Sequence, residues 1–73
     1  MTKLPQLKSG QVIKALKRLG FQVVRQRGSH VRLSHSNGRL VSVPYHNRPL
    51  FVGTLHSILS QANIPIETLL ENL

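Results

Sequence analysis

Three short segments with the character of β-strands occupy the middle of the chain, and tight turns separate them. The first segment is rich in β-branched and aromatic residues, and the other two alternate apolar with polar residues. The connections are Arg27-Gly28-Ser29 and Ser36-Asn37-Gly38, and an Asn-Gly pair supplies the positive φ of a hairpin turn. The sequence predicts an antiparallel meander whose strands span residues 21–26, 30–35 and 39–43.

Helical periodicity flanks this meander on both sides. The first predicted helix spans residues 9–19, with Ser9 as its N-cap and Gly20 just beyond its end. A second apolar stripe starts near Thr54, a candidate cap, and Pro65 suits the start of a last short helix. The apolar stripes are Val12, Ile13, Leu16 and Leu19 in the first helix and Leu55, Ile58, Leu59 and Ala62 in the second.

These elements predict an α+β fold in the order α-β-β-β-α, with a three-stranded antiparallel sheet, helices on one face and a short C-terminal helix. The other face of such a sheet stays open. Double-stranded-RNA-binding domains share this element order, which is an analogy of fold. A length of 73 residues fits one small domain, residues 1–73.

Charge is distributed unevenly along the sequence. The ten Lys and Arg residues lie between Lys3 and Arg48, whereas the two acidic residues are Glu67 and Glu71, so the net charge is +8. A cationic body without internal counter-charges favours an anionic partner, and nucleic acid is the commonest polyanion for a protein of this size. A membrane surface is a poorer fit, because the basic residues do not share one long amphipathic helix. An acidic protein partner, or a basic surface without a specific role, stays open.

Several function classes conflict with the composition. The chain has no Cys and no Asp, so it cannot form a zinc ribbon or a disulfide scaffold, and a carboxylate metal site would depend on Glu67 and Glu71 alone. No His-x3-His or His-Glu-x-x-His spacing occurs and no acidic residue lies near the histidines in the sequence, so we expect neither metal nor cofactor. No apolar run is long enough to span a membrane, and the first ten residues do not resemble a signal peptide, so we expect a cytoplasmic protein.

His30 is the strongest candidate for chemistry. It follows the Gly28-Ser29 turn at the start of a strand, and the alternation of Val31 and Leu33 predicts that it faces away from the core. A neutral imidazole can accept the proton of a ribose 2′-OH, and an imidazolium can donate one to a leaving 5′-oxygen. Neighbouring cations can neutralise charge that develops on phosphorus, and the backbone N–H groups of a turn can bind phosphate. The candidate phosphate ligands are Arg25, Arg27, Ser29 and Arg32. The alternative is an ordinary surface histidine.

The other three histidines differ in how well they suit a catalytic role. His46 follows the last strand closely enough to act as a second acid or base, or to orient the first, although a loop histidine bonded to backbone is an equal alternative. His35 and His56 are expected to be solvent-exposed. Tyr45 can stack on a base or pack against the edge of the sheet.

The run Leu50-Phe51-Val52 precedes the second helix. We expect it to pack beneath that helix, and the alternative is an exposed patch that binds a partner.

The order and spacing of several short motifs resemble the HicA family of mRNA interferase toxins. The motifs are Gly28-Ser29-His30, Asn37-Gly38, Val43-Pro44-x-His46 and Gly53-Thr54-Leu55-x-x-Ile58-Leu59, and the opening helix that ends Leu16-x-x-Leu19-Gly20-Phe21 also fits. The resemblance covers about residues 8–64.

This resemblance implies a fold like that of double-stranded-RNA-binding domains and a ribosome-independent endoribonuclease that cleaves mRNA. It implies that His30 is the catalytic histidine, and it includes His46 as a further member of the site. It also implies a HicB-type antitoxin that covers the active site. The family often carries Lys or Arg where this chain has Leu50-Phe51-Val52, and Arg near His56, so the basic surface along the second helix is weaker here and the course of RNA past that helix stays open.

Two other functions remain open from the sequence alone. One is a non-catalytic RNA- or DNA-binding module that uses the same arginines, with His30 as a phosphate contact. The other is a protein-interaction module that binds an acidic partner through the basic face and the Leu50-Phe51-Val52 run.

Overall fold

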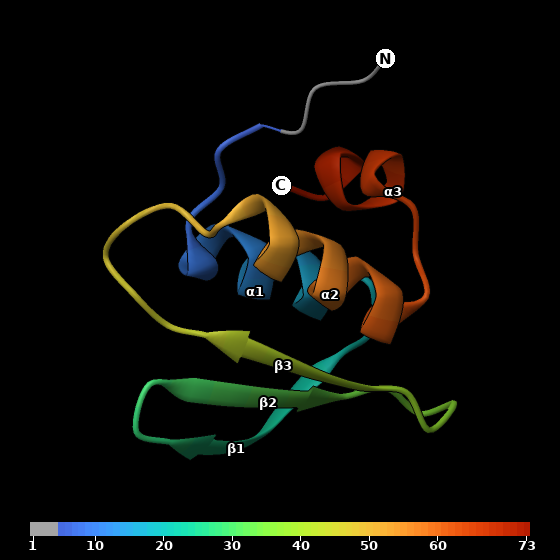
Figure 1. Cartoon of the computed structure of the whole chain (residues 1–73). Coiled ribbons are helices and arrows are strands. Elements are labelled where there is room, and N and C mark those ends of the chain that lie inside the picture. The colour runs from blue at the N-terminus through green and yellow to red at the C-terminus, as the bar shows by residue number, and fades with distance from the viewer. Residues whose placement is uncertain (1–4) are drawn as a thin grey trace.

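The structure is a computed structural model that describes residues 5–73, so Lys3, the first basic residue, lies outside the described residues (Figure 1). The predicted element order is confirmed, with a three-stranded antiparallel sheet in the order β1-β2-β3 and a short final helix. The elements are α1 (Ser9–Arg18), β1 (Gln22–Arg27), β2 (His30–Ser34), β3 (Leu40–Pro44), α2 (Val52–Ala62) and α3 (Ile66–Glu71). The helices lie on one side of the sheet, as in the double-stranded-RNA-binding-domain-like fold (Figure 1).

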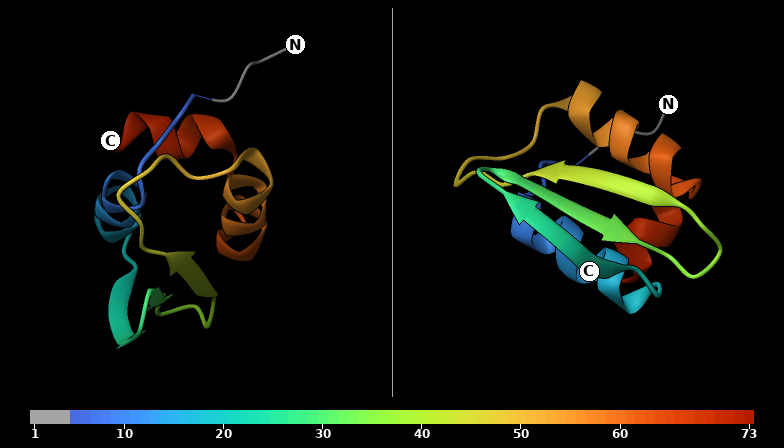
Figure 2. Two further views of the ribbon diagram at one scale, coloured as in Figure 1. Left: turned by 60° about the vertical axis from the view of Figure 1, so that its left-hand side comes forward. Right: turned by 90° about the horizontal axis from the view of Figure 1, so that it is seen from below.

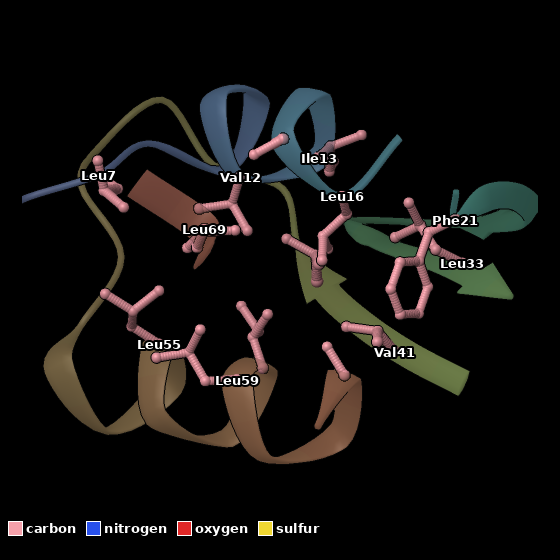
Figure 3. Packing of buried hydrophobic residues seen from close by; sticks show 14 of the residues in the cluster. Leu7, Val12, Ile13, Leu16, Phe21, Leu33, Val41, Leu55, Leu59 and Leu69 are labelled. Atoms are coloured by element: carbon pink, nitrogen blue, oxygen red, sulfur yellow. The ribbon is translucent and has the colours of Figure 1, made fainter. Parts of the chain in front are cut away.

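The hydrophobic core lies between the helices and one face of the sheet (Figure 3). Val12 and Leu16 of α1 and Leu55 of α2 are almost completely buried, as the predicted stripes require. Leu33 and Val41 project from the sheet to meet them, and the alternation of β2 and β3 produces this inner face. Complete burial of one such side chain stabilises the fold by roughly 1.5–3 kcal/mol.

The short helix α3 closes the remaining side of the core. It packs against α1 (Figure 2), and its Leu69 is completely buried. The guanidinium of Arg18, at the end of α1, donates hydrogen bonds to the carbonyl oxygens of Asn72 and Leu73, at 3.1 and 2.9 Å. A cation at these carbonyls satisfies helix-end acceptors that have no partner within the helix.

The helix ends match the sequence only in part. Gly20 ends α1 with φ 100°, and the N–H of Phe21 donates to the carbonyl of Leu16, which is the predicted glycine-terminated end. The expected N-caps were wrong. The N-cap of α1 is Lys8, and that of α2 is Phe51 rather than Thr54. Ser9 is instead a buried residue within the helix, and its hydroxyl donates to the carbonyl of His46 in the loop after β3.

The strand boundaries differ from prediction by one residue, and the difference matters at the first turn. Phe21 lies outside β1 and is buried in the core, whereas Arg27, expected in the turn, belongs to β1 and pairs with His30. The connection is therefore the two residues Gly28 and Ser29, with φ 58° at Gly28. In the second turn Gly38, but not Asn37, has a positive φ.

Across residues 5–73, every helix is too short or too polar to cross a lipid bilayer.

Candidate functional site

The open face of the sheet carries rows of residues that pair across all three strands. Val31, Leu33, Val41 and Val43 face the helices, so the residues between them face outward. In one row Arg27 pairs with His30, and His30 pairs with Pro44. In the next row Arg25 pairs with Arg32, and Arg32 pairs with Ser42. The strand register thus brings three guanidinium groups to one imidazole.

A β-bulge in β1 is part of this arrangement. The register shifts between Val23 and Arg25, so that Val23 pairs with Leu33 on the inner face while Arg25 pairs with Arg32 on the outer face. In a regular strand two residues that are two apart share a face, and Val23 would then join the arginines. The irregularity of β1 places Val23 and Arg25 on opposite faces of the sheet.

Arg25, Arg27, His30, Arg32 and Ser42 line an open hollow of about 370 Å³, which we call the arginine hollow. Its four charged or titratable residues are exposed, and Ser42 is half-buried. No acidic residue precedes Glu67 in the sequence, and both acids belong to α3, which packs against α1. Adjacent guanidinium groups without carboxylates repel one another and favour a bound anion such as a phosphate. Sequence reasoning did not select Ser42, although its place between the inward Val41 and Val43 was a usable signal.

The turn that carries His30 is held against the end of β3. The backbone N–H of Tyr45 donates to the carbonyl of Ser29, and His30 begins β2 as the Cα partner of Pro44. Ser29 is exposed, but its side chain is not among those that line the arginine hollow. Its role as a phosphate ligand stays a prediction.

His46 lines a second hollow and is not among the residues that line the arginine hollow. This hollow, which we call the loop groove, has a volume of about 160 Å³ and is lined by Pro44, His46, Arg48, Pro49, Leu50, Phe51 and Thr54. The backbone of His46 is fixed by Ser9, whose hydroxyl accepts its N–H at 3.0 Å and donates to its carbonyl at 3.1 Å. Pro44 relates the two hollows in the strand register, because it lines the loop groove and pairs with His30, which lines the arginine hollow.

The remaining histidines take no part in either hollow. His56 is exposed, as expected, whereas the prediction of an exposed His35 was wrong. The His35 ring packs edge-on against Phe21 with centroids 5.0 Å apart, and its Nδ1 accepts the N–H of Asn37 at 3.2 Å. A Cβ on Gly20 would come within 2.9 Å of His35 Nε2, so this position requires glycine for space as well as for its φ.

Two further candidates from the sequence are Tyr45 and the run Leu50-Phe51-Val52. The hydroxyl of Tyr45 lies 3.9 Å from the position of a Cβ on Gly10, so the ring extends toward α1 and lines neither hollow. In the run Leu50-Phe51-Val52, only Leu50 packs against the core, and the other two residues are exposed. The expected packing beneath α2 was thus right for Leu50 and wrong for Phe51 and Val52.

Arg39 has a structural role that the sequence did not indicate. It donates to the carbonyl of Ala62 at the end of α2, and its guanidinium lies 5.3 Å from the centre of the Phe21 ring. Like Arg18, it is engaged within the fold. The arginines of the arginine hollow belong to a different set.

Among residues 5–73, no three His, Asp or Glu side chains gather as potential metal ligands.

The fold and the site together define a small domain like those that bind double-stranded RNA, with an exposed histidine among arginines on the open face of its sheet. Comparison with known protein families places this chain among toxins: a model described as the HicA toxin of bacterial toxin–antitoxin systems matches residues 9–64. The chain belongs to the HicA toxin family. No protein with a curated description matches it.

Proposed function

We propose that this protein is a metal-independent endoribonuclease that cleaves mRNA in the cytoplasm with His30 as its catalytic residue. Membership of the HicA toxin family supports the toxin role. The observation that carries the enzymatic role is the register of β1, β2 and β3, which places His30 beside Arg27 and one row from Arg25 and Arg32. These residues form a cationic site for a phosphodiester with an acid–base group at its edge.

The reaction needs no external reactant other than RNA. Neutral His30 removes the proton from a ribose 2′-OH, and the 2′-oxygen attacks the adjacent phosphorus. The bond from phosphorus to the 5′-oxygen breaks, and that oxygen leaves with a proton. The products are a 2′,3′-cyclic phosphate and a 5′-hydroxyl. Arg25, Arg27 and Arg32 stabilise the extra negative charge on the phosphoryl oxygens in the transition state.

His46 is our candidate for the second proton. It does not line the arginine hollow, but the loop groove that it lines includes Pro44, the Cα partner of His30. RNA that passes from one hollow to the other would bring the leaving 5′-oxygen toward His46. His46 would then donate a proton to that oxygen or orient the departing nucleotide.

The partner that inhibits the enzyme is, in this proposal, a HicB-type antitoxin. Toxin–antitoxin family membership implies such a partner. A surface with a net charge of +8 favours an acidic antitoxin surface that covers the arginine hollow and excludes RNA. Antitoxin binding should then raise the unfolding temperature and abolish cleavage together. A complex that still cleaves RNA contradicts this mode of inhibition.

The decisive experiment compares the purified wild-type protein with His30→Ala on a defined transcript. Loss of a general acid–base group should lower the cleavage rate roughly 10²–10⁴-fold, while RNA binding and the circular dichroism spectrum change little. His56→Ala is the matched control, because His56 is exposed on α2 and lines neither hollow. Equal cleavage by wild type and His30→Ala would remove His30 from the mechanism.

The same assay tests metal independence. Cleavage by the wild-type protein should persist in EDTA, because the chain holds only two carboxylate side chains and both lie on α3. Activity that EDTA abolishes and Mg²⁺ restores contradicts the proposal. A protein that binds RNA but never cleaves it, with antitoxin fully removed, is the non-catalytic module of the same fold.

A further inference from the structure

The loop groove combines an apolar wall with a cationic one. Phe51 is 74% exposed, which makes it the most exposed of the large apolar side chains described, and it lines the groove with Leu50 and two prolines. Arg48 and His46, both exposed, and the half-buried Thr54 complete the lining. A large aromatic side chain that is left in water beside a cation indicates a binding surface, because burial would otherwise stabilise the fold.

The groove is held in place from several sides. Ser9 anchors His46 through two hydrogen bonds, and the N–H of Leu50 donates to the carbonyl of Leu7 at 2.8 Å. Lys8 and Pro49 form an isolated β-bridge next to this bond. Leu50 packs against the core, so Phe51 is exposed on a fixed segment. A preorganised surface loses little conformational entropy when a ligand binds.

The groove reaches the row of the sheet that contains His30. Pro44 lines the groove and is the Cα partner of His30, so a ligand that fills both hollows passes over the row that carries the histidine. The alternation of phosphate and base in a single-stranded nucleic acid matches a cation next to an aromatic face. The start of α2 at Val52 adds its positive dipole end to this region, as a secondary contribution.

We infer that the loop groove binds the nucleotide of single-stranded RNA next to the scissile phosphate, with its base stacked on Phe51 and its phosphate on Arg48. This subsite deepens the proposed function and rests on it. Base stacking is nearly independent of base identity, so the groove adds affinity and positions the strand without dictating the sequence that is cut. In this inference RNA passes α2 by stacking a base on Phe51. A run of Lys or Arg at the same place would instead bind the RNA through its phosphates.

The test exploits the absence of tryptophan from the chain. Phe51→Trp introduces a single fluorophore at the groove while it keeps an aromatic face. The probe is a ten-nucleotide 2′-O-methyl RNA of mixed sequence, which has no 2′-OH nucleophile and therefore stays intact. Saturable quenching of the Trp fluorescence is expected, because a stacked base lies in contact with the indole. The control is Leu70→Trp, at an exposed position on α3 outside both hollows, where no quenching is expected.

Affinity measurements complete the test. Phe51→Ala should weaken binding of this RNA roughly fivefold or more, and Phe51→Trp should restore it. Val52→Ala is the matched control, since Val52 is also exposed and does not line the groove, and its affinity should equal that of wild type. Arg48→Gln should lower the slope of log affinity against log salt by about 0.7, the contribution of one phosphate.

The outcomes separate this inference from the proposed function. RNA that binds the wild type but leaves Phe51→Trp unquenched and Phe51→Ala unimpaired overturns the groove inference alone. Loss of antitoxin binding in Phe51→Ala without loss of RNA binding assigns the groove to the protein partner and also overturns it. A wild-type protein that binds neither this RNA nor its unmethylated counterpart contradicts the proposed function itself.

Discussion

The two faces of the β-sheet are made by the same strands but differ in role: one packs in the hydrophobic core, and the other carries the candidate site. The inner face of β2 and β3 consists of Val31, Leu33, Val41 and Val43, which are at most 4% exposed. The outer face carries His30, Arg32 and Ser42 at the intervening positions. Because side chains alternate along a strand, a shift of the register by one residue would exchange the two sets. The apolar face therefore aligns the site, although none of its residues belongs to the site.

The largest effect is expected from a substitution on the inner face of the sheet. Leu33→Ala removes a completely buried side chain and should lower the free energy of unfolding by about 2–5 kcal/mol. Its neighbour on the outer face gives the control: Arg32→Ala should change stability by no more than about 0.5 kcal/mol, because it also relieves repulsion from Arg25. Urea titration of both variants measures the free energy of unfolding. Similar losses of unfolding free energy in the two variants would contradict the view that the inner face stabilises the fold and the outer face does not.

An intermediate effect is expected on the outer face. Arg32→Gln should weaken RNA binding roughly tenfold, as the loss of one charge-assisted contact. The salt dependence of log affinity should become shallower by about 0.7 for a single strand. Lys14→Gln is the control, since Lys14 is exposed on α1 in the helical layer. Fluorescence anisotropy over a range of salt concentrations measures both. An equal change in the two variants would show that the overall charge, and not the arginine hollow, binds RNA.

The smallest effect is expected from removal of the bulge. Deletion of Val24 should leave Val23 inside and Arg25 outside, because one residue fewer turns the bulge into a regular ladder with the same pairs. RNA affinity and cleavage should then stay within about threefold of wild type, a free-energy change of roughly 0.6 kcal/mol. Deletion of Gln26, in the regular part of β1, should instead turn Arg25 toward the helices and lower affinity as Arg32→Gln does. A Val24 deletion that is as harmful as the Gln26 deletion would assign the bulge a role of its own.

Much of the candidate site could be predicted from local sequence. The alternation around Val31 and Leu33 predicted that His30 and Arg32 face outward, and the structure places them with Arg25 and Arg27 in one hollow. The membership of Arg27 in β1 was harder to predict from the sequence. Its membership of the strand depends on pairing with His30, and pairing is a property of two segments. The position of the His46 backbone was not predictable either, because it is fixed by hydrogen bonds from Ser9, 37 positions earlier in the chain.

The amino-acid sequence by itself determined the element order, the two apolar stripes, the glycine at the end of α1 and the outward direction of His30. These features depend on neighbours within a few positions, where backbone geometry and side-chain period act directly. Only the tertiary structure decided that Ser9 would anchor a loop, that Arg18 and Arg39 would bind helix-end carbonyls, and that Phe51 would stay exposed beside Arg48. Those outcomes depend on which surfaces meet after the core has formed, since a polar group or an aromatic ring takes the partner that packing brings within reach.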